Sequence, residues 1–155
     1  MKKNNALFLP MIACLLACAH AFAQPAGSPK PQLNHVAFYV SDLQKSSSFY
    51  HDIIGLDTIP EPFHDGKHVW LRTGPKSELH LILGAAEGTE HNKNNHLCFA
   101  VPSLEDFIRA LQQKKVGYEN WPGDKNVVSL RVDGVKQIYF RDPDGYWIEI
   151  NNAKE

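Results

Sequence analysis

The chain has few cysteines, and their positions exclude an internal disulfide in the folded region. It contains three in 155 residues, and Cys14 and Cys18 both lie within the N-terminal residues 1–23. With that segment set aside only Cys98 remains, and one thiol cannot form a disulfide within its own chain. Stability must therefore come from packing, from a bound metal or from a partner subunit.

The chain also lacks an excess of charge of one sign. Lys and Arg total 16 and Asp and Glu total 17, which gives a formal net charge of −1 at pH 7. With no basic stripe to accompany that balance, nucleic acid is not expected as a partner. A long apolar run is missing as well, because the segment from Ala6 to Ala17 is shorter than the roughly 20 residues of a membrane span.

The N-terminus has the features of a secretory signal. A basic start, Met1-Lys2-Lys3, precedes the apolar run, and Ala21-Phe22-Ala23 gives the small-x-small pattern of a cleavage site. We interpret residues 1–23 as a cleaved signal peptide and the proline-rich residues 24–32 as a linker. These features predict an exported protein, periplasmic or secreted. Alternatively, Leu15-Leu16-Ala17-Cys18 resembles a bacterial lipobox, which would leave Cys18 lipidated and the protein anchored to a membrane.

Residues 33–152 have the length of one domain, and they show the same order of predicted elements twice. In residues 33–83, the apolar patterns predict one strand, one helix and three further strands. Asp42 is placed as the helix N-cap and Gly55 as its stop. The predicted strands of this unit cover residues 33–40, 58–63, 69–73 and 78–83.

The second unit, residues 95–151, follows the same plan. Its helix is predicted to begin after Ser103 and to end at Gly117. An Asp-Gly pair, which favours a hairpin, separates the second and third strands of each unit, at residues 65–66 and 133–134. The predicted strands cover residues 95–101, 127–132, 135–141 and 146–151. The sequence therefore predicts an α+β fold with a duplicated βαβββ unit.

Four side chains that can bind a metal occupy matching positions, on the first and last strands of each unit. Because side chains alternate along a strand, each lies opposite the apolar face that packs under the helix. They are His35, His80, His96 and Glu149. Imidazole nitrogen and carboxylate oxygen suit Zn, Ni, Co, Mn or Fe(II). A lone strand histidine is more often a hydrogen-bonded structural residue, but four matched positions favour one divalent metal site.

Several segments resemble the vicinal-oxygen-chelate superfamily, which contains glyoxalase I, bleomycin resistance proteins and dioxygenases. They are Leu33–Val40, Asp42-Leu43, His96, and the run Asp142-Pro143-Asp144-Gly145-Tyr146-Trp147-Ile148-Glu149, which is especially similar to bacterial glyoxalase I (lactoylglutathione lyase). The resemblance covers the whole of residues 33–152. It implies an eight-stranded cup of two βαβββ units around a metal, with the family's four ligand positions on the same three histidines and Glu149.

Some positions depart from the glyoxalase I pattern. His80 stands where the second ligand is often Glu. Tyr39 and Gly84 stand where glutathione-using members typically have Arg and Asn, which disfavours strict dependence on glutathione. Ala37 replaces the Thr that is usual in fosfomycin-modifying relatives.

The resemblance implies a metal-dependent, glyoxalase-like lyase or isomerase that acts on a small oxygenated substrate through a chelated enediolate. In that hypothesis Glu149 relays a proton between neighbouring carbons. Two other functions fit the same residues: a non-catalytic protein that binds a drug or an aromatic compound, and an Fe(II) dioxygenase. Side chains expected near the substrate are Tyr39, Trp70, Arg72, Arg131, Tyr139 and Trp147.

Two further expectations concern the surroundings of the site. Cys98 is expected to be a small core residue rather than a nucleophile. The polar connector of residues 84–95 resembles that of members that swap halves between subunits, which implies a homodimer with each metal site built from both chains.

The signal-peptide interpretation predicts the N-terminus of the mature protein. Sequencing of the exported protein is expected to begin at Gln24, because cleavage should follow Ala23. A lipid found on Cys18 would contradict this cleavage site and support the lipobox.

Overall fold

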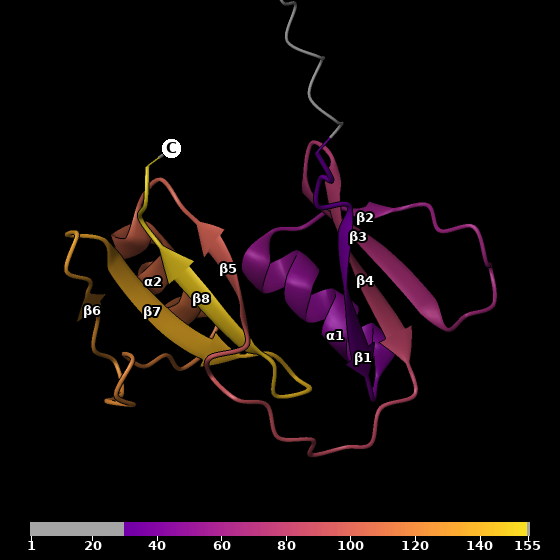
Figure 1. The fold of residues 1–155 in the computed structure, drawn as a ribbon. Coiled ribbons are helices and arrows are strands. Elements are labelled where there is room, and N and C mark those ends of the chain that lie inside the picture. Colours follow the sequence, from indigo (N-terminus) through magenta and orange to yellow (C-terminus); the bar gives the residue numbers. More distant parts are fainter. Residues whose placement is uncertain (1–29, 155) are drawn as a thin grey trace, which may run out of the picture. The chain divides into compact units, whose positions relative to one another are not determined.

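Eight strands lie in two four-stranded sheets, one from each half of the folded region (Figure 1). The structure, a computed structural model, describes residues 30–154. The predicted signal peptide and most of the predicted linker lie outside these residues. Within residues 30–154, no helix combines the length and the apolar character needed to cross a membrane. The predicted pair of βαβββ units is confirmed.

Each unit places its first and last strands side by side. The first unit contains β1 (His35–Val40), α1 (Leu43–Phe49), the π-helical turn η1 (Tyr50–Ile54), β2 (Thr58–Ile59), β3 (His68–Gly74) and β4 (Ser77–Leu83). The second contains β5 (His96–Ala100), α2 (Leu104–Gln113), β6 (Ser129–Leu130), β7 (Lys136–Arg141) and β8 (Trp147–Asn151). The sheet orders are β1-β4-β3-β2 and β5-β8-β7-β6, with β1 parallel to β4 and β5 parallel to β8.

The predicted helix starts are confirmed, and one of the two predicted stops is wrong. The Asp42 side chain accepts a hydrogen bond from the Lys45 amide at 3.0 Å, and Ser103 caps α2 in the same way. Gly55 ends the first helical segment in the left-handed region, with φ of 87°. The second helix ends at Gln113 rather than at Gly117, because Lys115 already takes the left-handed conformation, with φ of 57°.

Two predicted strands are much shorter than expected. The first, β2, stops at Ile59 because Pro60 follows directly and has no N–H for the ladder. Residues 60–67 therefore form a loop. The predicted hairpin is present, because β2 and β3 pair antiparallel across this loop, but the connection is longer than a tight turn at residues 65–66. The second, β6, covers only Ser129–Leu130. Glu119 exchanges two backbone hydrogen bonds of 2.8 Å with Tyr139 of β7, and so takes the place that residues before Ser129 would need.

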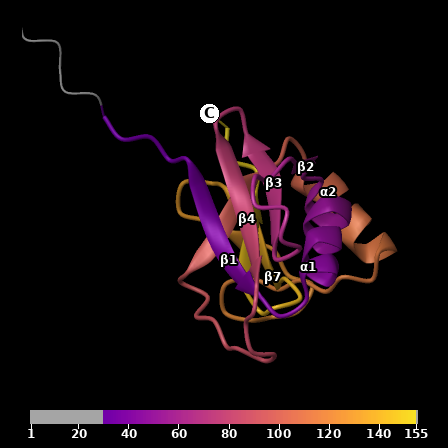
Figure 2. The ribbon, with the colours of Figure 1, turned by 90° about the vertical axis from the view of Figure 1, so that its right-hand side faces the viewer.

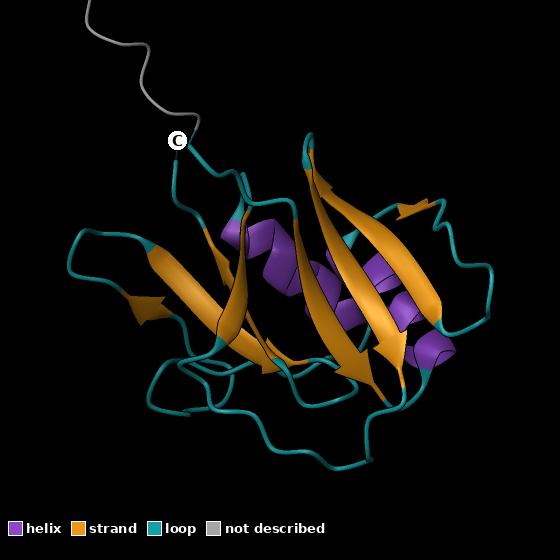
Figure 3. Ribbon diagram, turned by 45° about the vertical axis from the view of Figure 1, so that its right-hand side comes forward, coloured by secondary structure: helices purple, strands orange, loops and turns teal. Residues whose placement is uncertain are grey.

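The two faces of each sheet have different roles. One face packs against the helix of the same unit; Figure 2 shows α1 beside its sheet, and Figure 3 shows the strands and helices by type. A fully buried Leu or Ile on this face contributes roughly 1.5–3 kcal/mol relative to an exposed one. The buried strand residues include Phe38, Val40, Leu79, Leu81, Ile148 and Ile150. The predicted apolar faces are confirmed, and the alternate residues lie on the opposite face, called the open face here because the helix of the unit does not cover it. Several of its residues, Tyr139 and Glu149 among them, are nevertheless buried.

The turn at residues 142–145 connects the two units. The buried Tyr50 hydroxyl donates to Asp142 Oδ2 at 2.7 Å, and Asp144 Oδ1 accepts from the Ser41 amide and hydroxyl, both at 2.7 Å. The Ser46 hydroxyl donates to the other oxygen of Asp144. Burial raises the pKa of Asp142 above its ordinary value, although hydrogen bonds from Tyr50 and two backbone amides oppose the shift. The carboxylates of Asp142 and Asp144, in the second unit, thus bind the helical segment of the first unit through hydrogen bonds.

Removing the Tyr50 hydroxyl is expected to destabilise the protein. Tyr50→Phe leaves a buried carboxylate oxygen without its donor, which costs about 1–3 kcal/mol of unfolding free energy. Denaturant unfolding measures the loss. Tyr118→Phe is the matched control, because the Tyr118 hydroxyl makes only a 3.3 Å contact with the Asn126 carbonyl. An equal loss in both variants would contradict the assigned role of Asp142.

The cost of Tyr50→Phe is also expected to depend on pH. The hydroxyl favours the ionised form of Asp142, so its removal should raise the folded-state pKa of that carboxyl further. A raised folded-state pKa means that stability is lost as pH rises through it. The difference between wild type and Tyr50→Phe should therefore be largest at neutral pH and should shrink in acid.

Candidate metal centre

Two of the predicted ligands lie next to each other on the open face of the first sheet. His35 of β1 stacks on His80 of β4, with ring centroids 4.2 Å apart. Trp70 of β3 stacks on the other side of His80 at 4.1 Å, since β4 lies between β1 and β3. The three rings border a cavity of about 480 Å³ that Phe63 also lines.

Each of these histidines has one ring nitrogen held by an acceptor. His35 Nδ1 lies 2.8 Å from Asn34 Oδ1, and His80 Nε2 lies 3.0 Å from Glu78 Oε2. Amide and carboxylate oxygens accept, so the contacting nitrogen carries the proton in each ring. The other nitrogen of a neutral ring then keeps its lone pair, which is how metal-binding histidines are oriented.

The remaining two predicted ligands meet on the open face of the second sheet. His96 Nδ1 lies 2.8 Å from the Lys93 carbonyl oxygen, and His96 Nε2 lies 3.2 Å from Glu149 Oε2. Because a carbonyl oxygen can only accept, Nδ1 carries a proton, and in a neutral His96 ring the lone pair on Nε2 would face the carboxylate. Two acceptors in contact need a cation between them, either a proton on Nε2 or a metal ion. The donor set therefore fits a divalent metal.

The carboxylate of Glu149 is held by three donors on its own sheet. The Tyr139 hydroxyl donates to Oε2 at 2.7 Å, while Asn151 Nδ2 and the Cys98 thiol donate to Oε1 at 2.8 and 3.3 Å. Burial by itself raises the pKa of Glu149, but the hydrogen bonds outweigh it and hold the pKa below the ordinary value. Glu149 is thus kept ionised and fixed in orientation.

Cys98 does not belong to the core, so that expectation is wrong. It lies on the exposed, open face of β5, paired in register with Glu149. Partial burial and the neighbouring carboxylate raise the pKa of the Cys98 thiol to about 12. A thiol with that pKa is a poor nucleophile near neutral pH, as expected from the sequence.

Within one chain the four predicted ligands form two pairs rather than one cluster. His35 and His80 belong to the first sheet, and His96 and Glu149 to the second. Among residues 30–154, no three His, Cys, Asp or Glu side chains come together as a metal site. One copy of the chain therefore presents two half-sites.

The six predicted substrate residues separate into two groups. Trp70 lies against His80, and Tyr139 and Trp147 lie on the face of Glu149. The other three are less directly placed: Tyr39 is 53% exposed, Arg72 pairs with Glu78 at 3.4 Å, and Arg131 pairs with Asp133 at 2.6 Å. Tyr39 also covers Gly84, because a Cβ added to that glycine would collide with the Tyr39 hydroxyl.

Several contributors were not identified from the sequence, among them Asn34, whose side-chain oxygen holds His35 Nδ1. Glu78 and Asn151 could have been found by strand alternation, because they share a face with His80 and Glu149 respectively. Lys93 could not, since it orients His96 from an irregular loop through its backbone carbonyl.

Comparison with known proteins gives consistent matches over most of the chain. A family model of the Glyoxalase/Bleomycin resistance protein/Dioxygenase superfamily matches residues 32–150. Mitochondrial methylmalonyl-CoA epimerase of Mus musculus is 32% identical over 133 residues, which are 79% of this chain and 73% of that protein. Glyoxylase I 4 of Arabidopsis thaliana is 29% identical over 142 residues, 84% of this chain and 76% of that one.

A solved structure shows the same fold. Lactoylglutathione lyase from Agrobacterium tumefaciens superposes with a TM-score of 0.60 at 20% identity, covering 80% of this chain and 95% of that one.

Proposed function

Because the chain belongs to the Glyoxalase/Bleomycin resistance protein/Dioxygenase superfamily, we propose that it is a metal-dependent lyase or isomerase. It would move a proton between neighbouring carbons of a small oxygenated substrate. The observation that carries the proposal is the contact of His96 Nε2 with Glu149 Oε2 at 3.2 Å, in which two acceptors face each other. His35 and His80 also support it, because an oxygen acceptor holds one nitrogen of each ring and leaves the other nitrogen for a metal.

In this proposal His35, His80, His96 and Glu149 hold one divalent metal, which is Zn, Ni, Co, Mn or Fe. When bound, the metal would supply the positive charge that favours loss of a proton beside a substrate oxygen. Glu149 accepts that proton and returns it to the neighbouring carbon, because its buried carboxylate is kept ionised by the hydrogen bonds around it. Tyr139 and Asn151 keep the carboxylate in one orientation through their hydrogen bonds.

We further propose that a complete centre needs two copies of the chain. The support is the division of the ligands into two pairs, one histidine pair on the first sheet and His96 with Glu149 on the second. Three or four ligands are the usual number for a catalytic metal, and neither pair reaches it. A second copy that brings its second sheet to face the first sheet would complete the set.

A non-catalytic binding protein is the second candidate. The aromatic lining of the 480 Å³ cavity, with Phe63, Trp70 and the stacked histidines, favours an aromatic compound there. A protein with this function would bind such a compound equally well with and without metal.

Metal binding is the first test of the proposed centre. Calorimetric titration of purified protein with Zn²⁺ or Ni²⁺ is expected to show saturable binding, and the metal should raise the melting temperature. His96→Ala should lose most of both effects, since it removes one ligand of the pair with Glu149. His64→Ala is the matched control, because His64 is 81% exposed on a loop and should leave both unchanged. If wild type binds no divalent metal at micromolar concentration, the enzymatic proposal fails.

Sharing of the centre between subunits is tested by complementation. His35→Ala and Glu149→Ala proteins should each bind metal poorly, because each lacks one ligand. Their mixture, after subunit exchange, should recover sites in which one subunit supplies an intact first sheet and the other an intact second sheet. Unchanged metal content in a mixture shown by mass spectrometry to contain heterodimers would place each centre within a single chain.

The substrate is not expected to depend strictly on glutathione. Tyr39 and Gly84 fill together the two positions where Arg and Asn are typical of glutathione-using members. Export, which we propose from residues 1–23, would also remove the protein from most of the thiol. The glutathione hemithioacetal of methylglyoxal should therefore be turned over with kcat/KM below about 10⁴ M⁻¹s⁻¹, the low end of the usual enzyme range. A higher value, measured with added metal, would contradict this expectation.

A further inference from the structure

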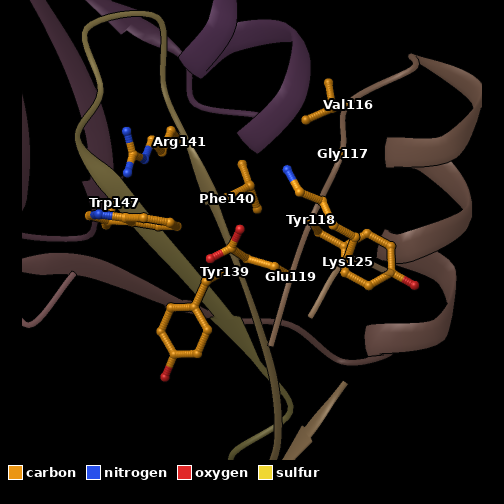
Figure 4. A pocket seen from close by; sticks show the side chains of 9 residues that line it. All are labelled: Val116, Gly117, Tyr118, Glu119, Lys125, Tyr139, Phe140, Arg141 and Trp147. Atoms are coloured by element: carbon orange, nitrogen blue, oxygen red, sulfur yellow. The ribbon is translucent and has the colours of Figure 1, made fainter. Parts of the chain in front are cut away.

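A second cavity borders the Glu149 side of the proposed centre. It has a volume of about 500 Å³ and lies between β7, the start of β8 and the loop that follows α2. In Figure 4, Arg141 and Trp147 lie on one side of this cavity and Tyr118 and Lys125 on the other, with the Glu119 carboxylate between them. Two of these residues, Tyr139 and Trp147, also belong to the face that carries Glu149.

The two cations of this cavity are available to a ligand. Among residues 30–154, no carboxylate forms an ion pair with Arg141 or with Lys125. The Arg141 guanidinium lies over the Trp147 ring, 4.5 Å from its centroid, and this stacking restrains the side chain. A restrained guanidinium with free N–H donors is suited to bind a carboxylate or a phosphate.

The acidic residue of the cavity is already compensated. Glu119 Oε1 accepts a hydrogen bond from Lys93 Nζ, which also donates to the carbonyl oxygens of Asn120 and Trp121 at 3.1 and 3.2 Å. The Lys93 side chain is only 16% exposed, so this pairing is shielded from solvent. The charges of Arg141 and Lys125 therefore remain, and the cavity is net positive.

The distance between this cavity and Glu149 allows one substrate to reach both. Tyr139, which lines it, donates to Glu149, and Arg141 lies two residues further along β7. Two residues of a strand span roughly 7 Å. A substrate with its reacting carbon beside Glu149 could therefore place a second group, several bonds away, against Arg141.

We propose that this cavity is an anion-binding subsite, in which Arg141 and Lys125 take a phosphate or carboxylate group of the substrate. The substrate of the proposed function would therefore carry an anionic group in addition to the oxygens at the reacting carbons. The inference rests on the proposed function for the reaction at Glu149. The anion site itself consists of residues that hold no metal, so it is measurable on metal-free protein.

The test uses labelled protein from which a chelating resin has removed metal. This protein is titrated with inorganic phosphate and, separately, with malonate, and binding is measured by NMR. Wild type should bind at least one of them saturably at millimolar concentration, with shifts at Arg141 and Trp147. Arg141→Gln should weaken binding about 10-fold or more, and Lys125→Gln about 3-fold or more, as expected for lost charge-assisted hydrogen bonds. Lys76→Gln is the matched control, because Lys76 is exposed in the turn between β3 and β4 of the first sheet and does not line the cavity.

The anion-binding experiment tests the subsite, and the metal titration tests the proposed function. The anion that binds more tightly identifies the group that the subsite prefers. Absence of saturable binding in wild type, or equal binding by wild type, Arg141→Gln and Lys125→Gln in correctly folded protein, would overturn the subsite. If the wild type binds no metal, the proposed function is overturned. The anion-binding result is unaffected, because it is measured on metal-free protein.

Discussion

The position of Glu149 depends on the carboxylate of Asp142. One oxygen of Asp142 accepts from the amides of Asp144 and Tyr146 at 2.9 and 2.8 Å, and these bonds shape the turn between β7 and β8. The turn sets the register in which Tyr139 lies opposite Glu149. The other oxygen accepts from Tyr50, so the same side chain also joins the turn to the first unit. A single buried carboxylate thus fixes both the local geometry of the second half-site and its attachment to the rest of the fold.

Strand alternation made most of the candidate site predictable. His96 and Glu149 could be placed on one face because both units showed a clear two-residue period, and the structure has them 3.2 Å apart. Cys98 was predicted for the core because its side chain is small and apolar, but its position on the strand decides its face. It has the same alternation as His96, and its side chain accordingly lies on the open face.

What could not be predicted lies in irregular backbone. The Lys93 carbonyl that orients His96 and the Glu119 bridge to Tyr139 belong to segments without any periodic pattern. Their positions follow from tertiary packing, which local sequence does not encode. The short length of β2 could have been predicted from the sequence, because Pro60 has no N–H to donate to the neighbouring strand. The division of the ligands into two pairs depends on how the units are arranged, and a pattern within each unit does not determine that.

The bridge made by Glu119 has a consequence for solubility. Residues 127–132 are rich in valine and leucine, and Leu130 and Val132 are 73% and 107% exposed. A full-length strand of that composition at the rim of a sheet would offer a row of free amides and carbonyls to a strand of another molecule. By occupying β7 at Tyr139, Glu119 limits the regular outer strand to two residues, and the Arg131–Asp133 pair places charge directly beside it. The same contact that positions one wall of the cavity thus protects the sheet from intermolecular pairing and aggregation.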